Sequence, residues 1–242
     1  MSRYGLVAVV AACGITGVAN AAPPPTINYT STFGITNSSA VVDETFNKTP
    51  LAQGTFKAYN PSTGVGGDAT ANSFFTESLT GAATLFPGSE DTLGAGFDPD
   101  GGADNYLAIG STGSGSASGA LTLTFTTAVQ YFSFAFGTLD NYNSVTVNYA
   151  DGSSYSFTGS GIIGGTNGAS PAQGTAGRVS FNANGGSAFS SIVLGSDYAA
   201  FEVDDLAAAA PEPGTWVMMI LGFGLLGSAL RYRRRKSTVA FA

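Results

Sequence analysis

The sequence predicts an all-β protein whose central part, residues 22–210, is a single antiparallel β-sandwich of the jelly-roll type. Three observations indicate this class. Short segments of alternating apolar and polar residues recur along the central part. Clusters of Gly, Asn, Ser and Asp separate these segments, as turns do in sandwiches. No stretch has a convincing helical period, and no period of fixed length indicates a solenoid.

The clearest expected strand is 131–136, because Phe132, Phe134 and Phe136 fall on one face of it. Residues 121–125 and 145–149 alternate in the same way before and after it. The dipeptide Asp151-Gly152 then predicts a hairpin turn, since glycine supports positive φ. The other expected strands are 27–35, 41–46, 55–59, 74–79, 106–109, 155–157, 178–181, 190–194 and 200–206, with Gly/Ser-rich loops at 110–119 and 159–177.

Composition excludes several kinds of chemistry. The 242 residues contain no histidine, and Cys13 is the only cysteine. Histidine-based triads and zinc sites with His or Cys ligands therefore lack their residues. Between residues 22 and 210, three cations stand against 15 of the 16 acidic residues, a net charge of −12. Such a surface repels phosphate backbones, so we expect no nucleic-acid partner.

The N-terminal residues have the pattern of a secretory signal peptide over 1–21. Arg3 precedes a short apolar run, and Ala19 and Ala21 are the small residues of an A-x-A exit. The sequence therefore predicts cleavage after Ala21, with the Sec translocon and signal peptidase as partners. Cleavage there would remove Cys13 and leave the mature chain without a disulfide.

The C-terminal region predicts a transmembrane helix at residues 215–230. This stretch is uncharged, and as a helix it would reach roughly 24 Å, somewhat less than the ~30 Å hydrocarbon core. Trp216 at one edge and the arginines that begin at Arg231 are typical interface anchors. We expect the arginines on the cytoplasmic side, the sandwich outside, and residues 237–242 as a short tail.

Residues 211–236 also resemble the PEP-CTERM sorting signal, most closely its PEPxxWA variant. The similarity rests on a tripeptide, a tryptophan three positions on and a basic cluster: Pro211, Glu212, Pro213, Trp216, Arg231, Arg233, Arg234 and Arg235. It implies an exosortase-type membrane protease that processes the protein at the inner membrane before it reaches the surface or the exterior. Val217 replaces the usual alanine of the variant, and residues 237–242 extend past the point where most members stop.

The central part carries a second resemblance, to galactose-binding-like or lectin-like jelly rolls. It rests on residues 134–157 and on the closing segment 201–206. This resemblance implies binding of carbohydrate, such as an exopolysaccharide. Asp140, Asn141 and Tyr142 are the candidate ligand-binding residues, because an exposed ring can stack on a sugar while carboxylate and amide groups bind its hydroxyls.

A candidate calcium site lies in residues 97–106. Asp98, Asp100 and Asp104 can converge on one hard cation, although a solvated turn explains the same residues. Asp204 and Asp205 form a second candidate, of which only one can face the core or an ion, because neighbouring strand residues point to opposite faces.

We therefore expect an exported, non-catalytic surface or extracellular-matrix protein without catalytic residues. Two other functions stay open. One is a polysaccharide-acting glycosidase or lyase, which needs paired carboxylates, although the spacing of Glu77, Glu90 and Glu202 does not pair them. The other is a calcium-stabilised structural or adhesive protein.

Overall fold

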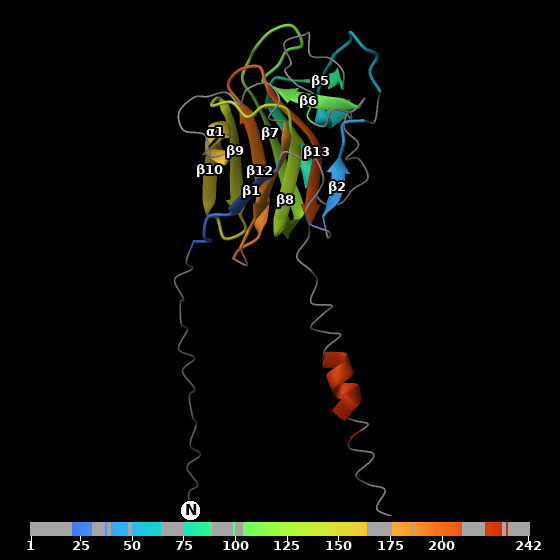
Figure 1. Ribbon diagram of the computed structural model, residues 1–242, viewed down its shortest axis with the longest axis vertical. Coiled ribbons are helices and arrows are strands. Elements are labelled where there is room, and N and C mark those ends of the chain that lie inside the picture. Colours follow the sequence, from blue (N-terminus) through green and yellow to red (C-terminus); the bar gives the residue numbers. More distant parts are fainter. Residues whose placement is uncertain are drawn as a thin grey trace, which may run out of the picture.

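Two antiparallel β-sheets that lie face to face form the body of the protein (Figure 1). A computed structural model describes residues 21–30, 37, 40–47, 50–63, 75–88, 99, 104–163, 176–184, 186–209, 221–228 and 231. The expected β-sandwich is confirmed by this arrangement.

The first sheet has eight strands, and its main path runs through seven of them. In spatial order these are β1 (Thr26–Thr30), β11 (Gly177–Asn182), β8 (Tyr131–Phe136), β13 (Phe201–Ala209), β6 (Asn105–Ile109), β5 (Ala83–Pro87) and β3 (Lys57–Ala58). The eighth strand, β2 (Val41–Glu44), pairs with the second half of β13, beyond the point where β6 ends. An irregular register between Asp204 and Ala207 separates the two halves of β13.

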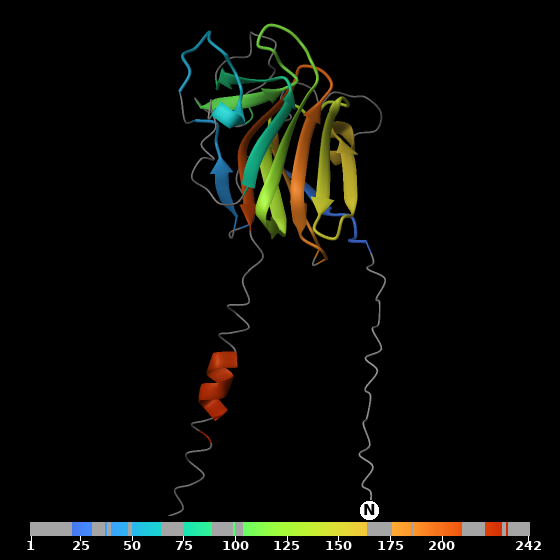
Figure 2. The same cartoon turned by 180° about the vertical axis from the view of Figure 1, so that it is seen from behind.

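The second sheet has five strands, which Figure 2 shows from behind. In spatial order they are β10 (Ser154–Thr158), β9 (Asn143–Tyr149), β12 (Phe189–Ser196), β7 (Gly119–Val129) and β4 (Phe75–Gly81). The chain passes between the sheets from β7 to β8 and again from β8 to β9. A short helix, α1 (Gly159–Ile162), follows β10, and a 3₁₀ turn, η1 (Pro61–Thr63), follows β3.

The core lies between the sheets and is rich in phenylalanine. Phe132, Phe134 and Phe136 are all fully buried in it, which confirms that they share one face of β8. The ring of Phe134 contacts those of Phe181 and Phe201, from the two strands that flank β8. Burying one such side chain contributes about 1.5–3 kcal/mol, so this row anchors the first sheet on the second.

The strand registers define two ends of the sandwich. Thr26, Asn182, Tyr131 and Ala209 lie in one row across the first sheet, at what we call the lower end, as drawn in Figure 1. The first strand of the body, β1, therefore begins at the lower end, and its last strand, β13, ends there. At the opposite, upper end lie the loop from β8 to β9 and the loop from β12 to β13, since Asn143 is level with Ser196 there.

Most expected strands are present within a few residues of their predicted bounds. Of the expected strand 27–35, residues 31–35 lie outside the described residues. The strand β5 was not expected, because both of its faces are buried and it has no alternation: Leu85 packs in the main core, and Phe86 stacks on Tyr106 on the other face. The helix α1 also forms where a loop was expected.

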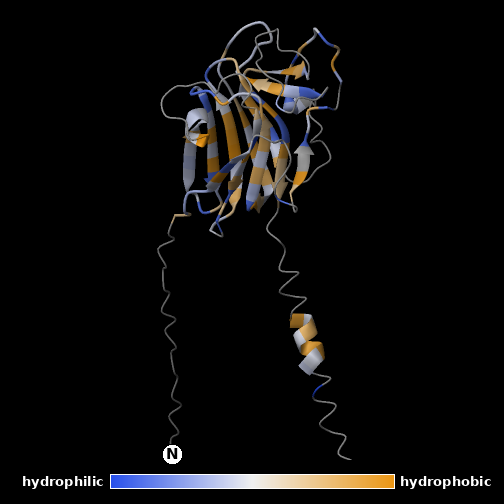
Figure 3. Ribbon diagram, viewed as in Figure 1, coloured by the Kyte–Doolittle hydropathy of each residue, from blue (hydrophilic) through white to orange (hydrophobic). Residues whose placement is uncertain are grey.

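The expected transmembrane helix 215–230 is described only at residues 221–228, which are helical. Leu221, Phe223, Leu225 and Leu226 are exposed on this short helix, which Figure 3 colours as largely apolar. Within the described part of the chain, no helix combines the length and apolar character that a membrane crossing requires.

Candidate functional site at the upper end of the sandwich

The candidate site is formed by two loops that are distant in sequence. Residues 137–142 connect β8 to β9, and residues 197–200 connect β12 to β13. The backbone N–H of Asp197 donates to the carbonyl of Tyr142 at 3.2 Å, so the loops are joined directly. The structure thus brings residues of two segments together at one surface.

Tyr142 and Tyr198 form an aromatic pair on this surface. Their ring centroids are 5.7 Å apart and the planes meet at 75°, an edge-to-face contact. Tyr142 is half-buried, whereas 62% of Tyr198 is exposed to solvent. Tyr198 therefore offers an aromatic ring to a ligand, and Tyr142 holds that ring from the side.

Asp140 is oriented by Tyr142. The Tyr142 hydroxyl donates to Asp140 Oδ2 at 2.7 Å and lies 3.5 Å from the carbonyl oxygen of Ala199. Burial, followed by the hydrogen bond to Asp140 and the negative charge of Asp140, raises the pKa of Tyr142 above its usual value. Tyr142 therefore stays protonated at physiological pH and acts as a donor. Asn141, beside it, is exposed.

Beneath this surface lies a buried acid, Glu202, which is 1% exposed. Its Oε2 accepts from the backbone N–H of Thr138 at 3.2 Å and from the Thr138 hydroxyl at 2.8 Å. The same hydroxyl lies 3.4 Å from Asp140 Oδ2, so Thr138 bridges the two acids. Burial raises the pKa of Glu202 to about 8, the charge of Asp140 adds to the effect, and the Thr138 hydrogen bonds oppose it.

Asn143, the first residue of β9, holds the loops in place from inside. Its Oδ1 accepts from the Asp140 N–H at 2.5 Å, and its Nδ2 donates to Ser196 Oγ at 3.0 Å and to the Ala200 carbonyl at 3.3 Å. Ser196 Oγ in turn donates to the carbonyl of Tyr198 at 2.6 Å. One fully buried side chain therefore links the loop that carries Asp140 to the loop that carries Tyr198.

A third loop supports the 197–200 segment. The Ala199 N–H donates to Ser116 Oγ at 2.7 Å. A Cβ at Gly110 would lie 2.3 Å from the carbonyl oxygen of Tyr198, and Gly110 has a positive φ of 87°. Only glycine allows this close approach. The position of Tyr198 is therefore fixed by backbone packing.

The sequence identified Asp140, Asn141 and Tyr142 but missed Tyr198 and Thr138, and it named Glu202 without placing it beside Asp140. An aromatic residue in the short break between two expected strands was the available signal for Tyr198. Glu202 carried no such signal, because its partner Thr138 is 64 residues away. Of the other three glutamates of the body, Glu44 accepts from the Phe46 N–H, Glu77 accepts a hydrogen bond from the Tyr59 hydroxyl, and Glu90 lies outside the described residues.

The candidate calcium residues are not assembled in the described part. Asp98 and Asp100 lie outside the described residues, and Asp104 is exposed. Across the described ranges, no three Asp, Glu, His or Cys side chains are grouped as metal ligands. Asp205 of the second candidate pair forms a salt bridge with Arg178 at 3.3 Å, and Asp204 is buried with its Oδ1 accepting from the Asp205 N–H.

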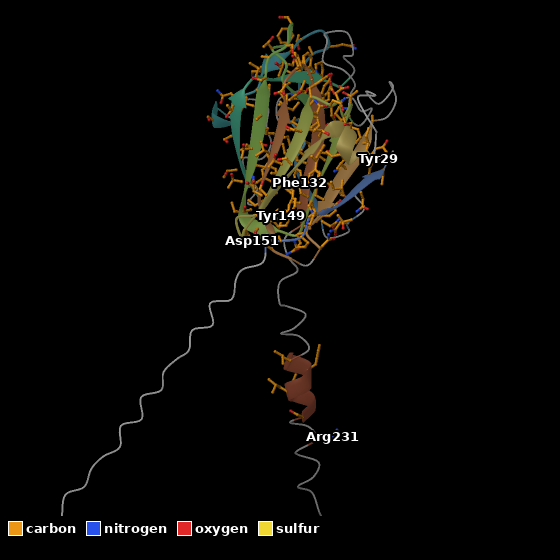
Figure 4. The ribbon with its side chains drawn as sticks, turned by 90° about the vertical axis from the view of Figure 1, so that its left-hand side faces the viewer. Tyr29, Phe132, Tyr149, Asp151 and Arg231 are labelled. Carbon is orange, nitrogen blue, oxygen red and sulfur yellow. The ribbon has the colours of Figure 1, made fainter. Side chains whose placement is uncertain are left out.

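Most residues of the two processing signals also lie outside the described residues: Ala19, Pro211, Glu212, Pro213, Trp216, Arg233, Arg234 and Arg235. Ala21 is described and exposed, and Arg231 is described in helical conformation and exposed (Figure 4). The signal-peptide assignment stays a prediction.

Comparison with known proteins gave one match. The family model of the PEP-CTERM protein-sorting motif matches residues 209–235. Searches of curated proteins and of solved structures found no match. The likeness of the central part to lectin-like jelly rolls therefore stays a prediction. Residues 209–235 carry the PEP-CTERM protein-sorting motif, and the chain is an exported protein that exosortase sorts through a membrane-anchored intermediate to the cell surface.

Proposed function

We propose that the mature protein is a non-catalytic surface or extracellular-matrix protein that binds carbohydrate at the upper end of its sandwich. The observation that carries this proposal is the exposed ring of Tyr198, fixed against Tyr142, whose hydroxyl donates to Asp140. Exopolysaccharide is the ligand class that we favour.

The chemistry of the surface suits a sugar. A pyranose ring has an apolar face of C–H groups and a rim of hydroxyls. The ring of Tyr198 can stack on the apolar face, and Asp140 and Asn141 can bind the hydroxyls. Because Asn143 and Ser116 fix the two loops, little conformational entropy is lost when a ligand binds.

The position of the surface also suits a tethered protein. Ala209, the first residue of the sorting motif, lies at the lower end of the sandwich. The six residues of β8 separate the two ends by roughly 20 Å. A body held at the membrane through the motif would therefore present Tyr198 on the side away from the attachment point.

Binding of the mature chain to glycan arrays and to exopolysaccharide purified from the host tests the proposal. We expect a retained glycan and a loss of affinity of roughly ten-fold in Tyr198→Ala, as expected for one lost aromatic contact. Tyr29→Ala is the matched control, because Tyr29 is an exposed tyrosine on the edge strand β1, outside the two loops of the candidate site, and its ring contacts Phe136. Absence of any retained glycan, or equal affinity of Tyr198→Ala and wild type, would contradict the proposal.

A glycosidase is the second candidate, supported by the proximity of Glu202 and Asp140 and by the raised pKa of Glu202. Catalysis would require the loops to open, because Glu202 is buried. Release of reducing sugars from the bound glycan, abolished by Glu202→Gln, would favour this function over simple binding.

A further inference from the structure

The first described residues of the chain are held firmly at the lower end of the sandwich. Ala21 is exposed, but Ala22 is only 4% exposed, and its backbone N–H donates to Asp151 Oδ2 at 2.8 Å. Asp151 lies in the β9–β10 turn, 129 residues further along the chain. Ala22 is thus buried between the exposed residues Ala21 and Pro23.

Side chains of the body also hold the carbonyl groups that follow. The Tyr155 hydroxyl donates to the Ala22 carbonyl at 2.7 Å, and the Tyr149 hydroxyl donates to the Pro23 carbonyl at 3.1 Å. Asn184 Nδ2 donates to the Pro24 carbonyl at 3.1 Å. Prolines have no N–H, so these carbonyls are the backbone groups through which Pro23 and Pro24 can be held.

Asp151 is itself oriented toward Ala22. Its Oδ1 accepts from the Ser153 N–H at 2.9 Å and from the Ser153 hydroxyl at 2.6 Å, while its own N–H donates to Ser187 Oγ at 3.1 Å. These contacts leave Oδ2 directed at Ala22. Figure 4 shows Tyr149 and Asp151 at the same end of the body.

We propose that this arrangement is a docking site for the mature N-terminus, created when the chain is cleaved between Ala21 and Ala22. Hydrolysis adds one water across that bond, which leaves a carboxylate on Ala21 and an α-ammonium on Ala22. The ammonium forms an ion pair with Asp151, so a hydrogen bond from a neutral amide to a carboxylate becomes one between opposite charges. The inference rests on the export part of the proposed function and is independent of glycan binding.

The ion pair gives the mature chain a characteristic pH dependence. The titratable groups that face Ala22 from the described elements are Asp151, Tyr149 and Tyr155, and burial raises the pKa of Tyr149 to about 12. A free α-amino group titrates near pH 7.7–8, and a carboxylate within 3 Å favours its charged form. While Asp151 is ionised, stability from the pair is therefore complete below about pH 7.7 and is lost as the pH rises through the higher folded-state pKa of the amine.

Intact mass and N-terminal sequencing of protein isolated from the native host test the cleavage position. We expect Ala22 as the first residue. Any other first residue in the exported protein would overturn the inference, and it would leave the glycan-binding proposal unaffected.

A double-mutant cycle tests the ion pair itself. Two chains that extend to Ala242, one starting at Ala22 and one retaining Asn20-Ala21, are each made with Asp151 and with Asp151→Asn, and their unfolding in urea is compared. With Asp151, we expect the Ala22 start to lower the unfolding equilibrium constant about two- to five-fold at pH 7 and low salt, as exposed ion pairs do. With Asp151→Asn, the two starts should unfold alike.

Asp197→Asn is the matched control, since Asp197 is an exposed aspartate at the upper end. The difference between the two starts should persist in this variant, and it should disappear in wild type above about pH 10. Equal unfolding of the two starts with Asp151 present, or a difference that survives Asp151→Asn, would overturn the ion pair.

Discussion

The two ends of the sandwich use the same kinds of side chain in different ways. At the lower end, the hydroxyls of Tyr149 and Tyr155 donate to backbone carbonyls of residues 22 and 23, so both tyrosines fix the chain. At the upper end, the hydroxyl of Tyr142 donates to the side chain of Asp140, and Tyr198 is left exposed. The comparison teaches that the lower-end tyrosines hold the backbone of the first described residues, whereas Tyr142 orients an acidic side chain beside an exposed ring.

The acidic residues at the two ends differ in burial and in the direction of their pKa shifts. Asp151 at the lower end is exposed, and hydrogen bonds from the Ser153 side chain and backbone hold its pKa below the usual value. Glu202 at the upper end is buried, and its pKa is raised to about 8. The lower end therefore carries a carboxylate at neutral pH, whereas the upper end has a largely protonated acid beneath its surface.

The largest expected effect comes from Glu202→Gln. Below about pH 4.5 Glu202 is protonated in both folded and unfolded chains, and between pH 4.5 and 8 only the unfolded chain ionises, so wild-type stability falls over this window. A pKa difference of this size corresponds to a decrease in the free energy of unfolding on the order of 5 kcal/mol across this window. Urea unfolding from pH 4 to 9 should show this decline in wild type and its loss in Glu202→Gln.

Asp151→Asn is the control for this pH profile, because the pKa of Asp151 is shifted in the direction opposite to that of Glu202. Because the folded-state pKa of Asp151 is lowered, its contribution is present above the usual aspartate pKa and is lost as the pH falls through the lowered value. Asp151→Asn should therefore leave the decline between pH 4.5 and 8 in place and alter the shape of the profile only below the usual aspartate pKa, in measurements extended below pH 4. A wild-type profile that is flat over that window would show that Glu202 is not a buried neutral acid.

A smaller effect is expected from the asparagines that hold each end. Asn143→Ala removes a fully buried side chain that bonds Asp140, Ser196 and Ala200, and should lower the free energy of unfolding by about 2–4 kcal/mol. Asn184→Ala removes the exposed contacts with Pro24 and Thr26 and should cost about 0.5–1 kcal/mol. Chemical denaturation of both variants measures the difference, and equal losses would contradict the contrast in burial.

Local patterns in the sequence predicted the parts of the fold that depend on near neighbours. Alternation predicted β8 and the inward row of Phe132, Phe134 and Phe136, because one face of that strand carries large apolar residues. The Asp151-Gly152 turn was also predicted and is confirmed, with a φ of 88° at Gly152. The strand β5 was missed because burial of both its faces removes the alternation.

Contacts between distant residues could not be predicted in the same way. The candidate site depends on Thr138 and Glu202, 64 residues apart, and the contact of Ala22 with Asp151 spans 129 residues. Each of these residues has an ordinary neighbourhood in the sequence. Their roles arise from strand order, which places β8 beside β13 and the β9–β10 turn beside the start of the chain.

The smallest effects are expected from two matched tyrosine variants, Tyr142→Phe and Tyr155→Phe. Each removes one hydroxyl from a half-buried ring, so each should lower the free energy of unfolding by only about 0.5–1.5 kcal/mol. Their other consequences should differ, because Tyr142 orients Asp140 and Tyr155 holds the carbonyl of Ala22. Tyr142→Phe should weaken glycan binding and leave the stability difference between the two N-terminal starts intact, while Tyr155→Phe should reduce that difference and leave glycan binding unchanged. Glycan binding and urea unfolding, measured on both variants, test whether the two ends act independently. A variant that altered both properties would show that they do not.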